Sequence, residues 1–164
     1  MSTSPTAAGP ALICFDGSDD AAAAIERAGG MLAPRAAVVL TVWEPVRSWA
    51  PYDPATILSA PLSRLASREL GLDEITRDLG REFLQRGLEL AAVAGFRCEG
   101  RSEKGKPWQI ICQVADELDA EPIVMGARGL GRLESALLGS VSTAVIFHSK
   151  RPVLLIPHHK AGGT

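Results

Sequence analysis

The chain has 164 residues, 46% of them hydrophobic and 22% charged, which suits a single ordinary globular domain. Its net charge of −2 gives no general attraction to nucleic acid or to a membrane, and no stretch approaches the roughly 18 apolar residues that span one. The three cysteines form no Cys-x-x-Cys pair, so we expect reduced thiols in a cytoplasmic protein: Cys14, Cys98 and Cys112.

The two ends of the chain lack the pattern of a folded element. The first ten residues carry neither the basic segment nor the apolar segment of a signal peptide. We expect flexible ends at 1–10 and 158–164 and a single domain at 11–157.

The first predicted elements are a strand and a helix. Residues 11–15 form an unbroken apolar run, which is typical of a strand buried on both faces. Ser18 is a good N-cap for the alanine-rich helix that follows and runs to Met31. Gly29 and Gly30 predict that this helix frays or stops there.

A second buried strand is predicted at 36–42, followed by an irregular excursion. Four prolines between 43 and 61 argue against a regular element. The stretch 62–93 has a helical period, but three glycines interrupt it, so it fits one helix or two. Its predicted apolar face consists of Leu72, Ile75, Leu79, Phe83, Leu84, Leu88 and Leu90.

Strands and helices keep alternating in the rest of the chain. We predict a weaker strand at 96–102, a helix that begins at Pro107, a strand at 122–125, a helix from Leu133 to about His148, and a strand at 152–156. This alternation implies right-handed crossovers and a parallel sheet covered on both faces. Ligands bind such sheets beyond the carboxyl ends of the strands.

Two strand-to-helix loops are candidates for ligand binding. The first, FDGSDD, is a poor phosphate site despite Gly17, because three carboxylates would repel an anion. Asp16 can accept hydrogen bonds from a ribose hydroxyl or an adenine amino group, or it can form a local Asx turn. The second loop, which begins at Gly126, has no acid before Glu134 and carries two arginines. Its glycines allow backbone N–H groups to close on an anion, next to a helix N-terminus.

The segment Gly139-Ser140-Val141-Ser142 falls inside the last predicted helix. A glycine there costs about 1 kcal/mol relative to alanine. Either a ligand close to the backbone or a contact between small residues of two helices would explain it. Other phosphate motifs do not fit, because GxxxxGK[ST] is absent and Glu134 replaces the third glycine of a GxGxxG.

The spacing Gly126-x2-Gly129-x9-Gly139-Ser140 resembles the glycine motif of the universal stress protein family. The flanking segments PIVMG and RPVLLIP, the DGS of the first loop and the GKP before the third helix are also similar, so the resemblance covers 11–157. It implies a doubly wound, Rossmann-like α/β fold, with a five-stranded parallel sheet in the order 3-2-1-4-5 and helices on both faces. It also implies ATP binding and a homodimer, often paired through the last strand.

The resemblance assigns an adenine nucleotide to residues of several loops. Adenosine would be held by Asp16, by the backbone at Cys14 and Phe15, and by Val42 against the adenine. Ribose and phosphates would contact Met125, Gly126, Arg128, Gly129, Gly139, Ser140, Val141 and Ser142. Arg132 is added for its charge and proximity alone. Mg²⁺ can bridge the phosphates, with Ser140 or Asp16 nearby; no residue is assigned as a metal ligand.

We interpret the chain as an ATP-binding universal stress protein, a nucleotide-dependent module for stress response or signalling with an unidentified protein partner. One alternative is a weak ATP hydrolase or an adenylyl-type transferase that uses the same pocket. A second is a dimeric scaffold without nucleotide. No catalytic residue is assigned, because a Walker-type lysine is missing and the three histidines fit helix-end or surface roles: His148, His158 and His159.

Overall fold

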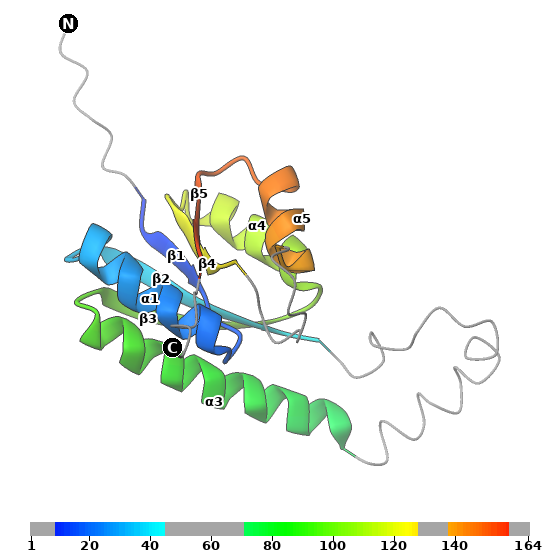
Figure 1. The fold of residues 1–164 in the computed structure, drawn as a ribbon. Coiled ribbons are helices and arrows are strands. Elements are labelled where there is room, and N and C mark those ends of the chain that lie inside the picture. The colour runs from blue at the N-terminus through cyan, green and yellow to red at the C-terminus, as the bar shows by residue number, and fades with distance from the viewer. Residues whose placement is uncertain (1–8, 45–70, 128–137, 158–164) are drawn as a thin grey trace, which may run out of the picture.

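The computed structural model describes residues 9–44, 71–127 and 138–157, in which strands and helices alternate as predicted (Figure 1). The elements are β1 (Ala11–Cys14), α1 (Asp19–Leu32), β2 (Ala36–Trp43), α3 (Leu72–Val93), β3 (Arg97–Lys104), α4 (Pro107–Glu117), β4 (Ile123–Gly126), α5 (Ser140–His148) and β5 (Val153–Ile156). Most of the predicted proline-rich excursion, the start of the helix predicted from 62, and both predicted flexible ends except residues 9 and 10 lie outside the described residues.

The five strands form one parallel sheet in the order β3-β2-β1-β4-β5, which confirms the predicted fold class. The chain winds from β1 outward to β3 and then returns to β4 on the other side of β1. The switch point of the winding therefore lies between β1 and β4, where Leu12 is in register with Ile123. The loops that follow these two strands start side by side at the carboxyl edge of the sheet.

Alternate side chains of each strand enter two separate cores. One core contains Ile13 and Phe15 of the first strand and its loop, and it is covered by α1 and α3. The other contains Leu12 and Met125 and is covered by α4 and α5. Figure 1 shows the two pairs of helices on opposite sides of the sheet. Aliphatic residues buried on both faces explain why the strands read as unbroken apolar runs.

Helix α1 begins as predicted but ends later. The Ser18 Oγ accepts a hydrogen bond from the N–H of Ala21 at 3.2 Å, which confirms the predicted N-cap. The predicted stop at the glycine pair was wrong, because the helix continues to Leu32. A Cβ added at Gly29 would lie 2.5 Å from the carbonyl oxygen of Ala94. That glycine therefore allows α1 to pack closely on the turn after α3.

Helix α3 runs without a break for 22 residues from Leu72, with Gly71 as its N-cap, whereas residues 62–70 of the predicted helical stretch, and with them the choice between one helix and two, lie outside the described residues. Its internal glycines mark close contacts with neighbouring side chains. A Cβ at Gly87 would lie 2.9 Å from the ring of Phe15, and one at Gly80 would lie 3.3 Å from the ring of Trp43. The glycines therefore serve packing and do not interrupt the helix.

Only the second half of the predicted apolar face of α3 packs against the core. Ile75 and Leu79 are 54% and 46% exposed, and the side chain of Leu72 lies outside the described part. A helix of 22 residues is about 33 Å long, whereas the eight-residue β2 is about 26 Å long, so α3 overhangs the sheet. The residues packed against the core are Phe83, Leu84, Leu88 and Leu90.

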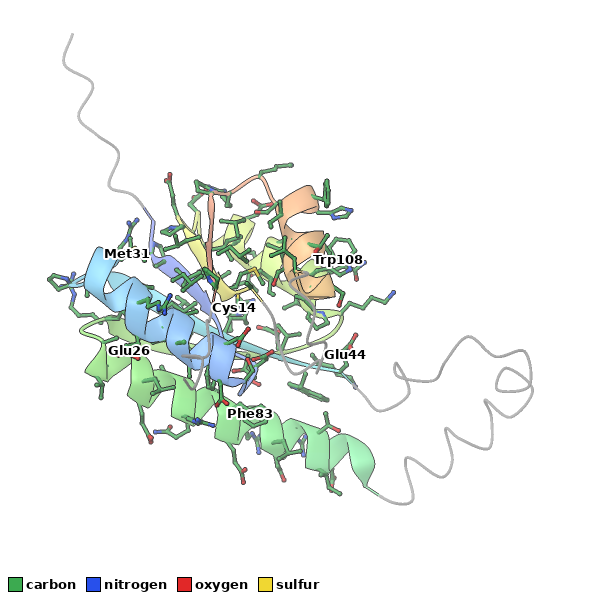
Figure 2. The ribbon with its side chains drawn as sticks, viewed as in Figure 1. Cys14, Glu26, Met31, Glu44, Phe83 and Trp108 are labelled. Carbon is green, nitrogen blue, oxygen red and sulfur yellow. The ribbon has the colours of Figure 1, made fainter. Side chains whose placement is uncertain are left out.

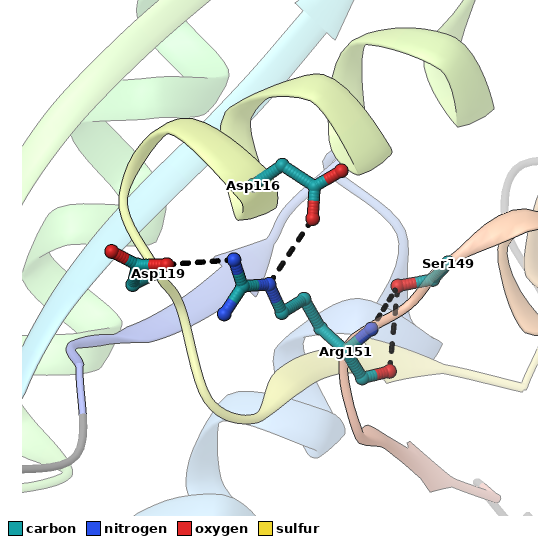
Figure 3. A network of polar contacts seen from close by, with 4 residues as sticks. All are labelled: Asp116, Asp119, Ser149 and Arg151. Carbon is teal, nitrogen blue, oxygen red and sulfur yellow. Dashed lines mark hydrogen bonds and ion pairs between the residues drawn. The ribbon is translucent and has the colours of Figure 1, made fainter.

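A surface network ties the loop before β5 to the end of α4 (Figure 3). The Arg151 Nε donates to Asp116 at 3.1 Å, and its Nη2 donates to Asp119 at 2.7 Å. The backbone N–H of Arg151 donates to the Oγ of Ser149 at 3.0 Å. Exposed ion pairs contribute little stability, so this network mainly fixes the position of the loop, at the edge opposite the strands' carboxyl ends.

Candidate functional site

The predicted nucleotide-binding residues converge on the carboxyl edge of the sheet. They follow β1, end β2, end β4 or begin α5, and parallel strands place all of these points at one edge. The structure places there Cys14, Phe15, Asp16, Val42, Met125, Gly126, Gly139, Ser140, Val141 and Ser142. The other three, Arg128, Gly129 and Arg132, lie outside the described residues.

The carboxylate of Asp16 closes a tight local turn. Its Oδ1 accepts hydrogen bonds from the Ser18 N–H at 3.0 Å and from the Ser18 Oγ at 2.6 Å. The local Asx turn is therefore present. Within the described part of the chain, both hydrogen bonds of Asp16 end on Oδ1, which leaves Oδ2 for a ligand. The two roles considered for Asp16 are thus compatible.

The backbone of this loop is held from both sides. Gly17 has φ +85°, a conformation that favours glycine, and a Cβ there would lie 2.8 Å from the ring of Phe83. Figure 2 shows Phe83 on the side of α3 that faces the start of α1. On the other side, the N–H of Phe15 donates to the carbonyl of Leu40 at 2.9 Å, and the carbonyl of Phe15 accepts from the Thr41 Oγ1 at 3.1 Å. The predicted backbone contact at Phe15 is therefore limited to the remaining lone pair of its carbonyl.

Thr41 is a site residue that sequence reasoning missed. Its side chain is buried at 2% exposure, and its hydroxyl fixes the loop through Phe15. The signal in the sequence was a single hydroxyl within the apolar run AAVVLTV. A buried hydroxyl needs a partner, so such a residue indicates a specific hydrogen bond.

The thiol of Cys14 lines the other face of the sheet at the same edge. Burial raises the pKa of Cys14 strongly, and the nearby Asp16 and Cys112 raise it further. Burial, and then Asp116, also raise the pKa of Cys112. Both groups therefore stay neutral thiols at pH 7, as expected of packing residues that are not reactive cysteines. Cys14, Cys98 and Cys112 are all free and half-buried.

The end of β2 adds a charged group beside the half-buried Val42. Burial raises the pKa of Glu44, while Lys106, at the start of α4, opposes that rise. Lys104 lies 5.3 Å from the ring centroid of Trp43. Figure 2 shows Glu44 at the end of β2, next to the edge at which the predicted residues meet. The carboxyl edge therefore carries both signs of charge.

Two hydrogen bonds join the end of β4 to the start of α5. The N–H of Gly139 donates to the carbonyl of Ala127 at 2.8 Å. The Ser142 Oγ donates to the carbonyl of Gly126 at 3.0 Å, and its side chain is buried at 4% exposure. The hydroxyl proton of Ser142 is thus already donated within the protein. A phosphate contact at Ser142 is left to its backbone N–H.

Helix α5 begins at Ser140, so the prediction that Gly139 lies inside the helix was wrong. Gly139 is the N-cap, with φ −62° and ψ 151°, because its N–H turns back to Ala127. The first helical bond runs from the Thr143 N–H to the Gly139 carbonyl at 2.9 Å. The three N–H groups before Thr143 have no acceptor within the helix, and glycine has no side chain to cap them. They are suited to bind an anion.

The conformation of Gly139 does not itself require glycine, because any residue adopts these backbone angles. Ser140 is exposed at the first helical position, while Val141 packs against the second core, to which Met125 belongs. The start of α5 thus presents N–H groups and one hydroxyl at the edge.

His148 lies at the opposite end of α5. It is about 12 Å from the start of the helix, because it lies eight residues after Ser140 and each residue adds about 1.5 Å. Its Nδ1 donates to the carbonyl of Ala144 at 2.8 Å, and its ring centroid lies 4.4 Å from that of Trp108. These contacts support the predicted helix-end role. The described residues contain no group of three or more metal-ligating side chains. No helix among them is long and apolar enough to cross a membrane.

Comparison with known proteins gives one consistent family. The model described as "Universal stress protein family" matches residues 9–157. A universal stress protein of Thermus aquaticus is 32% identical over 147 residues, which cover 88% of this chain and 96% of that protein. Universal stress protein Sll1388 of Synechocystis is 38% identical over 78 residues, or 48% of this chain and 51% of that protein. Some matches thus span only about half the relative's length.

Solved structures share the fold over nearly the whole chain. That of hypothetical protein MJ0577 has a TM-score of 0.70 at 22% identity and covers 95% of this chain and 100% of its own. A universal stress protein in complex with cAMP has a TM-score of 0.59 at 25% identity, and the match covers 93% of this chain and 98% of that protein. The universal stress protein from Archaeoglobus fulgidus in complex with dAMP has a TM-score of 0.57 at 21% identity, and the match covers 90% of this chain and 96% of that protein.

Proposed function

Because the chain belongs to the universal stress protein family, we propose that it binds ATP at the carboxyl edge of its sheet and acts as a nucleotide-dependent module in stress response or signalling. The arrangement at the edge suits a molecule with one neutral end and one anionic end. Asp16 offers a carboxylate oxygen to the hydroxyl or amino groups of adenosine. The start of α5 offers N–H groups to phosphates.

The start of α5, where no side chain of the described residues caps the first N–H groups, is the observation that carries this proposal. Gly139 replaces the Ser, Thr, Asp or Asn that normally satisfies these N–H groups, although its backbone angles suit those residues. A phosphate would satisfy the same groups. The cAMP and dAMP complexes of similar proteins support an adenine nucleotide in this family.

ATP, as opposed to a shorter nucleotide, is supported by the glycine motif and by the cations in its loop, Arg128 and Arg132. Mg²⁺ is usually held by phosphates with one or two protein oxygens, and the exposed hydroxyl of Ser140 fits such a contribution. The alternative of an ATP hydrolase requires a positioned base. The only histidine in the described ranges, His148, lies at the far end of α5, so we favour the binding module.

We also propose a homodimer paired along β5. The sheet has two edges, and five of the eight residues of β3 are charged, which discourages pairing at that edge. The other edge strand, β5, reads VLLI and carries no charge. Beside it, α5 exposes Ile146 at 43% and Phe147 at 79%. An apolar edge next to exposed apolar side chains favours a second copy of the chain as partner.

Thermal melting of nucleotide-stripped protein tests ATP binding. ATP with Mg²⁺ at 100 times its dissociation constant should stabilise the fold by about 2.7 kcal/mol. We expect a clear rise in Tm with ATP and none with GTP. Chromatography of the bound nucleotide then separates intact ATP, expected of a binding module, from the ADP expected of a hydrolase. No rise with either nucleotide would favour the scaffold without nucleotide.

A further inference from the structure

The hydroxyl of Ser18 joins the Asp16 carboxylate to the start of α1. It lies 2.6 Å from Asp16 Oδ1 and 3.2 Å from the backbone nitrogen of Ala21. The N–H of Ala21 can only donate, so the Ser18 oxygen accepts that bond. The hydroxyl proton is therefore available for Asp16, and the short distance is typical of a bond to a carboxylate. Ser18 is nearly buried, at 9% exposure.

This bond restricts the carboxylate more than the backbone alone does. The Ser18 N–H also reaches Oδ1, at 3.0 Å, so Oδ1 has two donors that converge from one residue. Rotation of the carboxylate would break both bonds. With Oδ1 fixed in this way, Oδ2 has a defined position. A preorganised acceptor loses less conformational freedom when a ligand binds.

We propose that Ser18 is a positioning residue for adenosine, which acts by holding Asp16 so that Oδ2 is presented to the ligand. The inference rests on the proposed nucleotide site and adds a residue that had been assigned only to capping. Ser18 makes its contribution through Asp16 and does not touch the nucleotide. Its role as N-cap of α1 is separate, because capping uses the oxygen as an acceptor and positioning uses the proton.

Three substitutions separate the two roles. Ser18→Thr keeps both the acceptor and the proton. Ser18→Asp keeps an acceptor for the Ala21 N–H, since Asp is a good N-cap, but has no proton to donate to Asp16. Ser18→Ala removes both. Adenosine is the probe, because it is uncharged and so responds little to the new charge at position 18.

Isothermal titration calorimetry of adenosine, with Tm measured in parallel, is the test. We expect Ser18→Thr to bind like the natural protein, and Ser18→Asp and Ser18→Ala to bind about tenfold more weakly, as for loss of one hydrogen bond to a charged group. Tm should fall with Ser18→Ala and stay close to the natural value with Ser18→Asp. Ser18→Asp with unchanged affinity would overturn the inference.

A double-mutant cycle tests whether Ser18 acts through Asp16. Once Asp16→Ala has weakened adenosine binding, adding Ser18→Ala should weaken it no further. A further tenfold loss would show that Ser18 acts independently and would overturn the inference. If Asp16→Ala alone leaves adenosine affinity unchanged, the assignment of Asp16 in the proposed nucleotide site is wrong. That result is distinguishable from a failure at Ser18 alone.

Discussion

Gly17 is constrained in two independent ways at the scale of the single residue. Its φ of +85° is unfavourable for any residue with a side chain, and the ring of Phe83 occupies the place of a Cβ. The neighbouring Asp16 and Ser18 form their turn around it. The conformation of Gly17 is therefore part of what places the Asp16 carboxylate at the edge of the sheet.

Gly17→Ala should lower the free energy of unfolding by about 2–4 kcal/mol. Alanine is strained in the left-handed backbone conformation of this position, and its Cβ would clash with the ring of Phe83. Denaturation in urea measures it. Gly30→Ala is the matched control, because nothing lies within 4 Å of a Cβ at that position in α1. That control should be more stable by up to about 1 kcal/mol. An unchanged stability of Gly17→Ala would contradict the contact with Phe83.

At the scale of the element, the position at which α5 begins determines where its first N–H groups lie. The sequence predicted a helix that starts at Leu133 and runs through Gly139, whereas α5 begins at Ser140. The difference comes from a bond between residues on either side of the loop, Gly139 to Ala127, which a local pattern does not reveal. The new boundary moves the positive end of the helix to the edge of the sheet.

Gly139→Asp should therefore have opposite effects on stability and on binding. The carboxylate caps α5 and complements its dipole, which should raise the stability of the nucleotide-free protein by about 0.5–1 kcal/mol. It also occupies the N–H groups and repels phosphates, so ATP affinity should fall sharply while adenosine affinity falls less. Melting curves and calorimetry measure both quantities. Gly139→Ala, which adds no charge, is the control; an ATP affinity of Gly139→Asp equal to that of the control would place the phosphates elsewhere.

The other helices show why glycine is hard to interpret from sequence. Gly29 and Gly87 both lie inside helices, where glycine usually predicts an end or a break. A Cβ at Gly29 would instead meet the backbone of Ala94, and a Cβ at Gly87 would meet the ring of Phe15. Both partners come from segments distant in sequence. Helix packing at these points compensates for the low helix propensity of glycine.

At the scale of the whole molecule, the two edges of the sheet differ in kind. The charged β3 is protected against pairing, and the apolar β5 is not. The residues of the proposed nucleotide site lie between them, at the switch point beside β1 and β4. A dimer along β5 would bring the two copies of α5 into the neighbourhood of the interface.

Phe147→Lys should convert the proposed dimer into a monomer without harming the fold. Phe147 is 79% exposed, so its loss removes little from the core, and a cation suits the last turn of α5. Sedimentation equilibrium should give twice the chain mass of 17.3 kDa for the natural protein and the chain mass for the variant. Val93→Lys, at the end of α3 and 89% exposed, is the control and should remain dimeric. A monomeric natural protein would contradict the proposal.

The sequence by itself determined the elements and their class of arrangement. Unbroken apolar runs indicated strands buried on both faces, Ser18 indicated the start of α1, and strict alternation indicated a parallel sheet. These features depend on short-range periodicity and capping, which neighbouring residues encode. The order of the strands was expected from the resemblance of the glycine motif.

Only the tertiary structure decided how the edge of the sheet is built. Thr41 reaches Phe15 across 26 residues, and Ser142 reaches Gly126 across 16 residues. Such bonds form only when the sheet brings distant segments together, so no local pattern specifies them. They settle which groups remain for a ligand, because the hydroxyl proton of Ser142 and one lone pair of the Phe15 carbonyl are already used within the protein.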